Sequence, residues 1–314
     1  MRVCSIRSAI CVLGFLVIGT PLSFQGNAQE NSETQVKSRE IQDLTAPGTG
    51  TAAGAWEDDE DFGKIEVLKL ARPWSVTLQT SVRGFWTSNA LLARKGEKGD
   101  TIFVESQGLT SSYRLTRDWR VEAGYSFDLT RYDENPLLDT DAQSAYFSTS
   151  FQFPYDWQLG AGVRGLWMTS PHQNVEVYRE CAPYGSLVHS HDFLDDRLTW
   201  FYGYQFDHRF THPVGFERDE HTIFTGASYS WRPDLLSQMV LRQNWQFYDF
   251  RPPSQPVNGR QEWTSTVGLQ TIWQPLSWLQ VSSFAMVSYD NSENASRDYK
   301  AANLGGEIRA FWKF

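Results

Sequence analysis

The sequence predicts an all-β protein, a closed antiparallel up-and-down barrel of about twelve strands that crosses a membrane. Three observations support this. From Arg72 onward apolar and polar residues alternate with a period of two, short turns alternate with longer polar loops, and tryptophans gather near both ends of the alternating segments. We expect a signal peptide over 1–28, a disordered acidic periplasmic tail over 29–71 and the transmembrane barrel over 72–314.

The composition narrows the class of protein further. The chain has 314 residues, with 28 Lys plus Arg and 37 Asp plus Glu, so its formal net charge is −9. An acidic chain without basic blocks is not expected to bind nucleic acid. A helical transporter needs several apolar runs of about 20 residues, whereas this chain has one, near its N-terminus. A secreted all-β protein or a membrane β-barrel remains.

The N-terminus has the pattern of an export signal. Arg2 and Arg7 precede an apolar stretch over 9–19, and the small residues Gly26-Asn27-Ala28 follow. This order of basic, apolar and small residues predicts cleavage after Ala28. Two of the three cysteines leave with the peptide, so the mature chain keeps only Cys181 and forms no intrachain disulfide.

The next segment differs from the rest of the chain. Residues 29–55 are rich in Gln, Glu, Ser, Thr, Ala and Gly, and an acidic run follows at 57–61. Such a segment buries too little apolar surface to offset its chain entropy, so we expect a disordered, solvated tail. A plug for a pore and a docking segment for a periplasmic protein are the alternatives.

Period-two alternation defines the strands, because successive side chains of a strand lie on opposite faces. In the last segment, 299–314, the even-numbered residues are mostly apolar and the odd-numbered residues are largely polar. The same alternation is found in 119–129, 157–167 and 198–209. Two segments alternate poorly, 101–116 and 177–190, and Pro183 interrupts the second.

Turns of two lengths separate these segments. Short turns are expected at Arg117-Asp118, Pro154-Tyr155-Asp156, Asp195-Asp196, Arg232-Pro233-Asp234 and Pro275-Leu276. Longer polar loops are expected at 88–100, 133–142, 170–177, 211–220, 251–260 and 290–298. Short turns on one side and long loops on the other are typical of outer-membrane barrels, and an even strand count places both barrel ends on the short-turn side.

Aromatic residues mark two levels along the strands. Near the short turns we expect a membrane girdle that contains Trp74, Trp119, Trp157, Trp200, Trp231, Trp273, Trp278 and Trp312. Near the loops we expect a second belt that contains Trp86, Tyr132, Trp167, Phe210, Trp245, Trp263 and Tyr289. An indole has an apolar body and a polar N–H, so a lipid–water boundary favours it.

The end of the chain resembles a known group of proteins. Its last strand ends in Phe314 and has apolar residues at 308, 310 and 312. This resembles the C-terminal signal of bacterial outer-membrane β-barrel proteins, and over 72–314 the architecture is most similar to β-barrel porins. The resemblance implies that barrel-assembly machinery reads Phe314, that outer-membrane lipid surrounds the barrel in a Gram-negative cell, and that both barrel ends face the periplasm. It implies no active-site residue.

The faces opposite the apolar ones are expected to line the lumen. The predicted lining residues are Arg83, Arg120, Glu122, Arg164, Asp207, Arg209, Arg242, Glu262, Glu307 and Arg309, with Glu105 and Asp128. Large apolar residues that narrow the bore are expected at Phe85, Phe201, Phe284, Met286 and Phe311. Charges of both signs are costly in a dry core unless they are paired, so a hydrated lumen or a set of ion pairs is expected.

Three functions and one other fold remain open. The mixed-charge lumen favours a passive channel for small hydrophilic solutes. The alternatives are an export, assembly or anchoring component that binds a periplasmic protein through residues 29–70, and a lipid hydrolase within the barrel. A soluble β-sandwich or propeller also alternates, but it needs a second layer over the apolar faces and the chain offers no helices for one.

No catalytic or metal-binding pattern is present, so we expect neither an enzyme nor a cofactor. His208 lies on the outward face of its strand, but no serine is placed beside it by the strand order. His189 and His191 lie near acidic residues, and His212 and His221 bracket an acidic loop. Solvated loop histidines explain these clusters better than a metal site does.

Overall fold

The computed structural model describes residues 34–39, 73–195, 197–248, 260–293 and 297–314. The predicted signal peptide and most of the predicted tail lie outside these ranges. The strands are β1 (Trp74–Thr87), β2 (Asp100–Arg114), β3 (Trp119–Tyr132), β4 (Thr140–Phe153), β5 (Trp157–Ser170), β6 (Val175–Phe193), β7 (Leu198–His212), β8 (Arg218–Arg232), β9 (Leu235–Tyr248), β10 (Gln261–Leu276), β11 (Leu279–Ser292) and β12 (Tyr299–Lys313).

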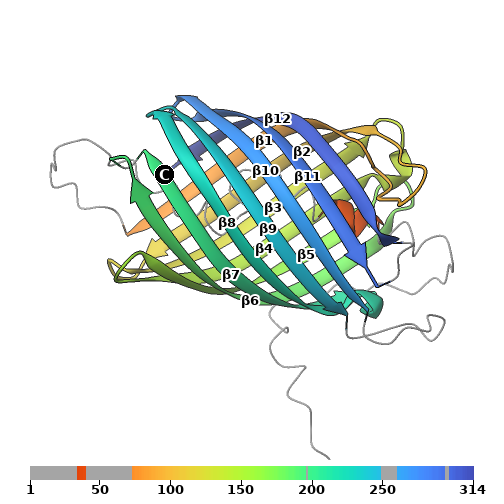
Figure 1. The fold of residues 1–314 in the computed structure, drawn as a ribbon, viewed down its shortest axis with the longest axis horizontal. Coiled ribbons are helices and arrows are strands. Elements are labelled where there is room, and N and C mark those ends of the chain that lie inside the picture. The colour runs from red at the N-terminus through yellow and green to blue at the C-terminus, as the bar shows by residue number, and fades with distance from the viewer. Residues whose placement is uncertain (1–33, 40–72, 196, 249–259, 294–296) are drawn as a thin grey trace, which may run out of the picture.

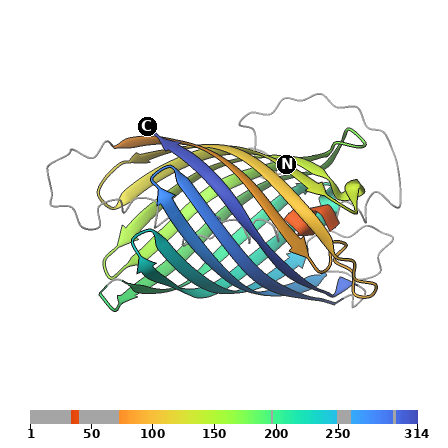
Figure 2. The same ribbon diagram turned by 90° about the horizontal axis from the view of Figure 1, so that it is seen from above.

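These strands form one closed antiparallel barrel (Figure 1). Each strand pairs with its neighbours in the chain, and β1 closes the barrel by pairing with β12 from Thr77↔Lys313 to Thr87↔Asn303. Figure 2 shows the tilted strands around the barrel, with the C-terminus and the start of β1 at the same end. The predicted up-and-down barrel is confirmed, and the sandwich and propeller alternatives are wrong.

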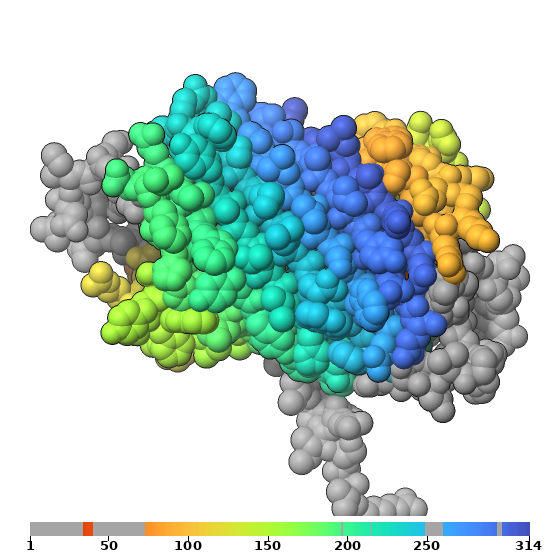
Figure 3. All heavy atoms as spheres, viewed as in Figure 1, coloured from red at the N-terminus to blue at the C-terminus, as the bar shows by residue number. Residues whose placement is uncertain are grey.

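The two faces of each strand have opposite environments. On β12, Leu304 and Ile308 are 63% and 59% exposed, whereas Asn303 and Glu307 are buried. This is the reverse of a water-soluble protein, and it holds around the barrel. Figure 3 shows one side of the outer wall. An apolar outer surface without a free sheet edge is the form in which β-structure spans a bilayer. The wall is therefore a transmembrane barrel.

Strand β6 is longer and more regular than its sequence suggested. It runs over 19 residues through Pro183, and it pairs with β5 at Val163↔Pro183. On the other side, Ala182 and Pro183 are not paired with residues of β7. Proline has no N–H to donate to such a pair. The strand therefore tolerates the proline by omitting a short part of one ladder.

Several loops are shorter than predicted because the strand ladders continue past the aromatic levels. The predicted loop 170–177 shrinks to four residues, since β5 ends at Ser170 and β6 begins at Val175. The predicted turn at Pro275-Leu276 is displaced. Strand β10 continues through a register shift to Leu276, and the turn follows it.

A short helix over 34–39 lies at the loop end of the barrel, the end that carries the loop between β1 and β2 (Figures 1 and 2). These six residues lie within the tail for which we expect disorder, and they form a helix where the barrel wall supplies partners that the local sequence does not show. No helix among the described residues is long and apolar enough to cross a bilayer.

Candidate functional site

The lumen is the candidate site, and the alternation of the strands positions its charged groups. The ten predicted lining residues, Arg83 to Arg309, all lie on the face opposite the exposed apolar band, as does Asp128. Glu105 does not, because Ile102 and Val104 are the inward residues of β2 and Glu105 is exposed on the outer face. The weak alternation of β2 in the sequence explains the wrong assignment.

An ion-pair network covers the inner wall from β5 to β8. It consists of Arg164, Glu180, Asp207, Arg209, Arg218 and Glu220. The Arg164 Nη2 atom lies 2.7 Å from Asp207 Oδ1, and Arg209 lies 3.0 Å from Glu180 and 2.8 Å from Glu220. Arginine suits this position because its planar guanidinium bonds two carboxylates at once.

Neutral donors complete the network. Tyr178 donates to Glu180 at 2.6 Å, Gln205 Nε2 donates to Asp207 at 2.8 Å, and Asn244 Nδ2 donates to Glu220 at 2.8 Å. Satisfying a buried carboxylate in this way offsets the cost of removing it from water. The network is thus a rigid polar lining rather than a set of mobile charges.

Sequence reasoning missed half of this network. Glu180 lies on the strand whose alternation Pro183 obscured, and Arg218 and Glu220 were placed in a loop that the structure assigns to β8. The period-two pattern does reach these residues, because Arg218, Glu220 and Thr222 are even-numbered like the buried Ser228 and so lie on the same face of β8. Extending the period-two pattern backward into the loop would have found these residues.

A second group of charges lies at the loop end, where Lys37 of the helix meets the wall. Its Nζ atom is 3.0 Å from Glu262 Oε2 and 3.4 Å from Asp290 Oδ2. Burial disfavours the charged amine, but the carboxylates of Glu262 and Asp290 outweigh this and raise the pKa of Lys37 well above its ordinary value. Lys37 therefore remains charged in the lumen.

Other helix residues contact the opposite part of the wall. Arg39 Nη2 donates to Asp128 Oδ2 at 2.6 Å, and Ser38 hydrogen-bonds to Tyr132, also on β3. Gln35 Nε2 donates to the backbone carbonyl of Leu137 at 3.1 Å, in the 3-10 turn that follows β3. Tyr132 therefore points inward, and its predicted place in the outer aromatic belt is wrong.

An apolar contact fixes the helix against a third part of the wall. Val36 is buried and packs in a cluster with Ala142 of β4, Met168 of β5 and Tyr178 of β6. In the strand order, β5 lies directly across the barrel from β11, which carries the Lys37 partner Asp290. Six residues thus reach opposite sides of the lumen and obstruct it at the loop end.

The middle of the lumen contains unfilled space on the β10 side. A Cβ atom added at Gly268, which faces inward opposite Met286, would have no atom within 4 Å. On the other side, Gly124 makes room for the ring of Tyr146, whose hydroxyl donates to Glu122. The lumen is therefore tightly packed beside Gly124 and unfilled beside Gly268.

The predicted girdle residues lie on the outer surface at the short-turn end. Trp74, Trp119, Trp200, Trp231, Trp278 and Trp312 are each between 44% and 59% exposed. Trp157 is half-buried because His189 and Tyr202 pack against it. Several indoles donate to hydroxyls on the wall, among them Trp74 to Ser111 at 2.7 Å and Trp119 to Thr149 at 2.6 Å.

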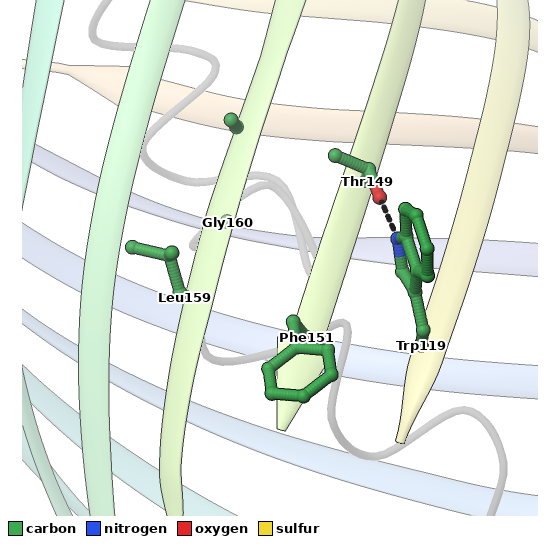
Figure 4. A pocket seen from close by; sticks show the side chains of 6 residues that line it. Trp119, Thr149, Phe151, Leu159 and Gly160 are labelled. Carbon is green, nitrogen blue, oxygen red and sulfur yellow. Dashed lines mark hydrogen bonds between the residues drawn. The ribbon is translucent and has the colours of Figure 1, made fainter. Parts of the chain in front are cut away.

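The outer wall has a shallow hollow of about 300 Å³ beside one of these indoles (Figure 4). Trp119, Phe151 and Leu159 line it, and the Trp119 indole points to Thr149 across it. Its lining is apolar and faces outward, so it belongs to the lipid-facing surface rather than to the lumen.

The outward histidine His208 has an acidic partner. Its Nδ1 atom is 2.6 Å from Asp219 Oδ1, on the neighbouring strand β8. No hydrogen bond to a serine is found for it within the described ranges, so the geometry supplies no catalytic triad there. Among the described residues, no group of three or more His, Cys, Asp and Glu is arranged to hold a metal ion.

Comparisons with known proteins name no family for this chain. No protein-family description matches the chain, and no curated protein is similar to it. The translocator domain of the autotransporter NalP from Neisseria meningitidis covers 92% of this chain and 100% of its own length, with 11% identity and a TM-score of 0.45. An outer-membrane channel from Pseudomonas putida F1 covers 81% of this chain and 99% of its own, with 11% identity and a TM-score of 0.48. The NanC porin covers 74% and 98%, with 10% identity and a TM-score of 0.43.

Proposed function

We propose that this protein is a passive channel for small hydrophilic solutes in the bacterial outer membrane, with its short turns on the periplasmic side. The observation that carries the proposal is the contrast between its faces, since a closed apolar exterior surrounds an inner face of charged and amide side chains. The unfilled space beside Gly268 supports a path along β10. Because the lining carries both signs of charge, we expect weak ion selectivity.

Planar-bilayer recording of the refolded protein tests this function. We expect small or rare steps from the full chain, because the helix over 34–39 obstructs the loop end, and regular steps from a variant that lacks residues 29–39. Conductance of the shortened barrel that cannot be told from lipid alone would contradict a passive channel.

A pair of substitutions on one strand separates conduction through the lumen from leakage around the barrel. Gly268→Trp fills the unfilled space and is expected to lower the step size. Val267→Trp adds the same side chain to the outer face, where Val267 is 48% exposed, and is expected to leave the step size unchanged. Equal effects of the two substitutions would place the current outside the lumen.

A further inference from the structure

The loop end of the lumen contains three buried carboxylates that form ion pairs with the helix. Asp128, Glu262 and Asp290 are 4%, 2% and 1% exposed. They come from β3, β10 and β11, so they surround the helix rather than form one patch on the wall. Bonds from Ser126, Tyr248, Ser292 and Thr264 hold them in place.

The cations that occupy this site belong to the N-terminal segment. Arg39 is paired with Asp128, and Lys37 is paired with both Glu262 and Asp290. Glu262 also forms an ion pair with the wall, to Arg260 at 3.1 Å. The site is thus defined by an observed cationic occupant as well as by its acidic groups.

The occupant is attached to the wall by side chains. Its described contacts are ion pairs, side-chain hydrogen bonds and the packing of Val36, and none of them belongs to a strand ladder. Residues 40–72 connect the helix to β1. A helix of six residues is not stable alone in water, so it exists in this place because the wall binds it, and its departure breaks no barrel backbone pair.

We propose that Asp128, Glu262 and Asp290 form a cation-binding site that closes the channel when the tethered helix occupies it and that opens when a free oligoamine displaces Lys37 and Arg39. The opening of the channel by an oligoamine rests on the proposed channel function. The exchange of the helix cations for the oligoamine does not depend on conduction. A molecule with several amines matches the site because the carboxylates lie on two sides of it. A single monovalent cation neutralises one carboxylate and leaves the other contacts of the helix intact.

Charge reversal in the full chain tests the occupant. Arg39→Asp and Asp128→Arg each set like charges against one another, so each is expected to raise the open fraction in bilayer recordings by roughly tenfold, the size of a typical coupling between two sites. The double variant restores an ion pair of reversed polarity and is expected to return to the closed behaviour. Arg232→Asp, at an exposed short turn, is the matched control. A double variant as open as either single variant would overturn the proposal.

A thiol probe tests the exchange without using conduction. In a Cys181→Ser background, Thr34→Cys places a single thiol on the helix. Thr34 takes no part in the ion pairs, hydrogen bonds or apolar packing that hold the helix to the described part of the wall. Spermine is expected to increase its reaction rate with a membrane-impermeant maleimide, again by roughly tenfold, and Asp128→Arg is expected to do the same without spermine. Sodium chloride at equal ionic strength is the control for screening.

The two measurements separate the two proposals. A thiol that responds to spermine in a barrel without conductance would overturn the channel and support the cation site. A thiol rate that ignores both spermine and Asp128→Arg would overturn the cation site, whatever the barrel conducts.

Discussion

The guanidinium of Arg164 on β5 lies 2.7 Å from the carboxylate of Asp207 on β7, so this ion pair crosses the intervening strand β6. The backbone hydrogen bonds of a barrel join each strand only to its immediate neighbours. The pair therefore ties three strands together on the inner face, and Gln205 supports it by donating to the second oxygen of Asp207.

We predict that Asp207→Asn weakens the barrel. The carboxylate is buried, but Arg164 is 36% exposed in side chain and can take up water. We therefore expect a loss near the low end for charged hydrogen bonds, about 1–2 kcal/mol of unfolding free energy. Urea unfolding in lipid vesicles measures it. Glu176→Gln, which removes a pair to Arg179 at the exposed loop end, should change stability by less than about 0.5 kcal/mol. Equal losses from the two substitutions would contradict a cross-strand role.

We predict that position 124 must be glycine for the barrel to be stable, because the ring of Tyr146 lies over it. A Cβ added there would overlap the Tyr146 ring from β4, so Gly124→Ala should destabilise the barrel by about 1–3 kcal/mol. Tyr146→Ser in the same chain removes the overlap and should recover part of the loss.

Gly268→Ala is the control for this effect, because nothing lies within 4 Å of its added Cβ. Thermal unfolding, followed by the gel mobility of the folded barrel, compares the variants. If Gly124→Ala and Gly268→Ala are equally mild, the inner wall along β3 and β4 is not packed as described.

The outer indoles are predicted to stabilise strand pairing as well as the lipid boundary. Trp119 donates to Thr149 Oγ1 at 2.6 Å across the β3–β4 pair. In lipid this bond has little competition from water, so Thr149→Val should cost about 1 kcal/mol. In a Trp119→Phe background the same change should cost less, because it then removes only the bond from Thr149 Oγ1 to the backbone carbonyl of Arg120 at 3.1 Å.

Unfolding in vesicles gives the coupling between these two substitutions as a double-mutant cycle. Trp312→Phe serves as the control, because its indole is also exposed on the outer face and no hydrogen bond to a described residue is found for it. A coupling of zero would mean that lipid headgroups, and not Thr149, satisfy the Trp119 N–H.

Local sequence determines the barrel but not the helix inside it. In β12, polar Asn303, Glu307 and Arg309 alternate with apolar Leu304, Ile308 and Ala310, so the strand and its two faces follow from the period-two pattern. The residues over 34–39 are mostly polar and have no such pattern. Their structure depends on partners such as Glu262 and Asp290, more than 200 positions later in the chain, and no local rule reports those contacts.

The errors on the wall have local causes. Glu105 is wrongly predicted to face inward because β2 alternates weakly. Tyr132 is wrongly predicted to lie in the outer belt because that prediction uses its position near the end of β3 and ignores whether even-numbered residues of β3 face inward. Parity is the stronger signal, since a one-residue shift moves a side chain to the other face. Asp128, Thr130 and Tyr132 share a parity and all are buried.

Phe314 is predicted to act in assembly rather than in the stability of the finished barrel. Its side chain is 71% exposed, so it packs little against the wall. Its backbone N–H donates to Val76 at 2.9 Å, a bond that any residue can make. Phe314→Ser should therefore leave the unfolding free energy of the refolded barrel nearly unchanged but lower the amount of folded protein in outer membranes of expressing cells.

Phe153→Ser, at another strand end of the short-turn side and 41% exposed, is the control and should assemble normally. Equal yields from the two variants would remove the assembly role, and a loss of stability in vitro for Phe314→Ser alone would assign the residue to the wall instead.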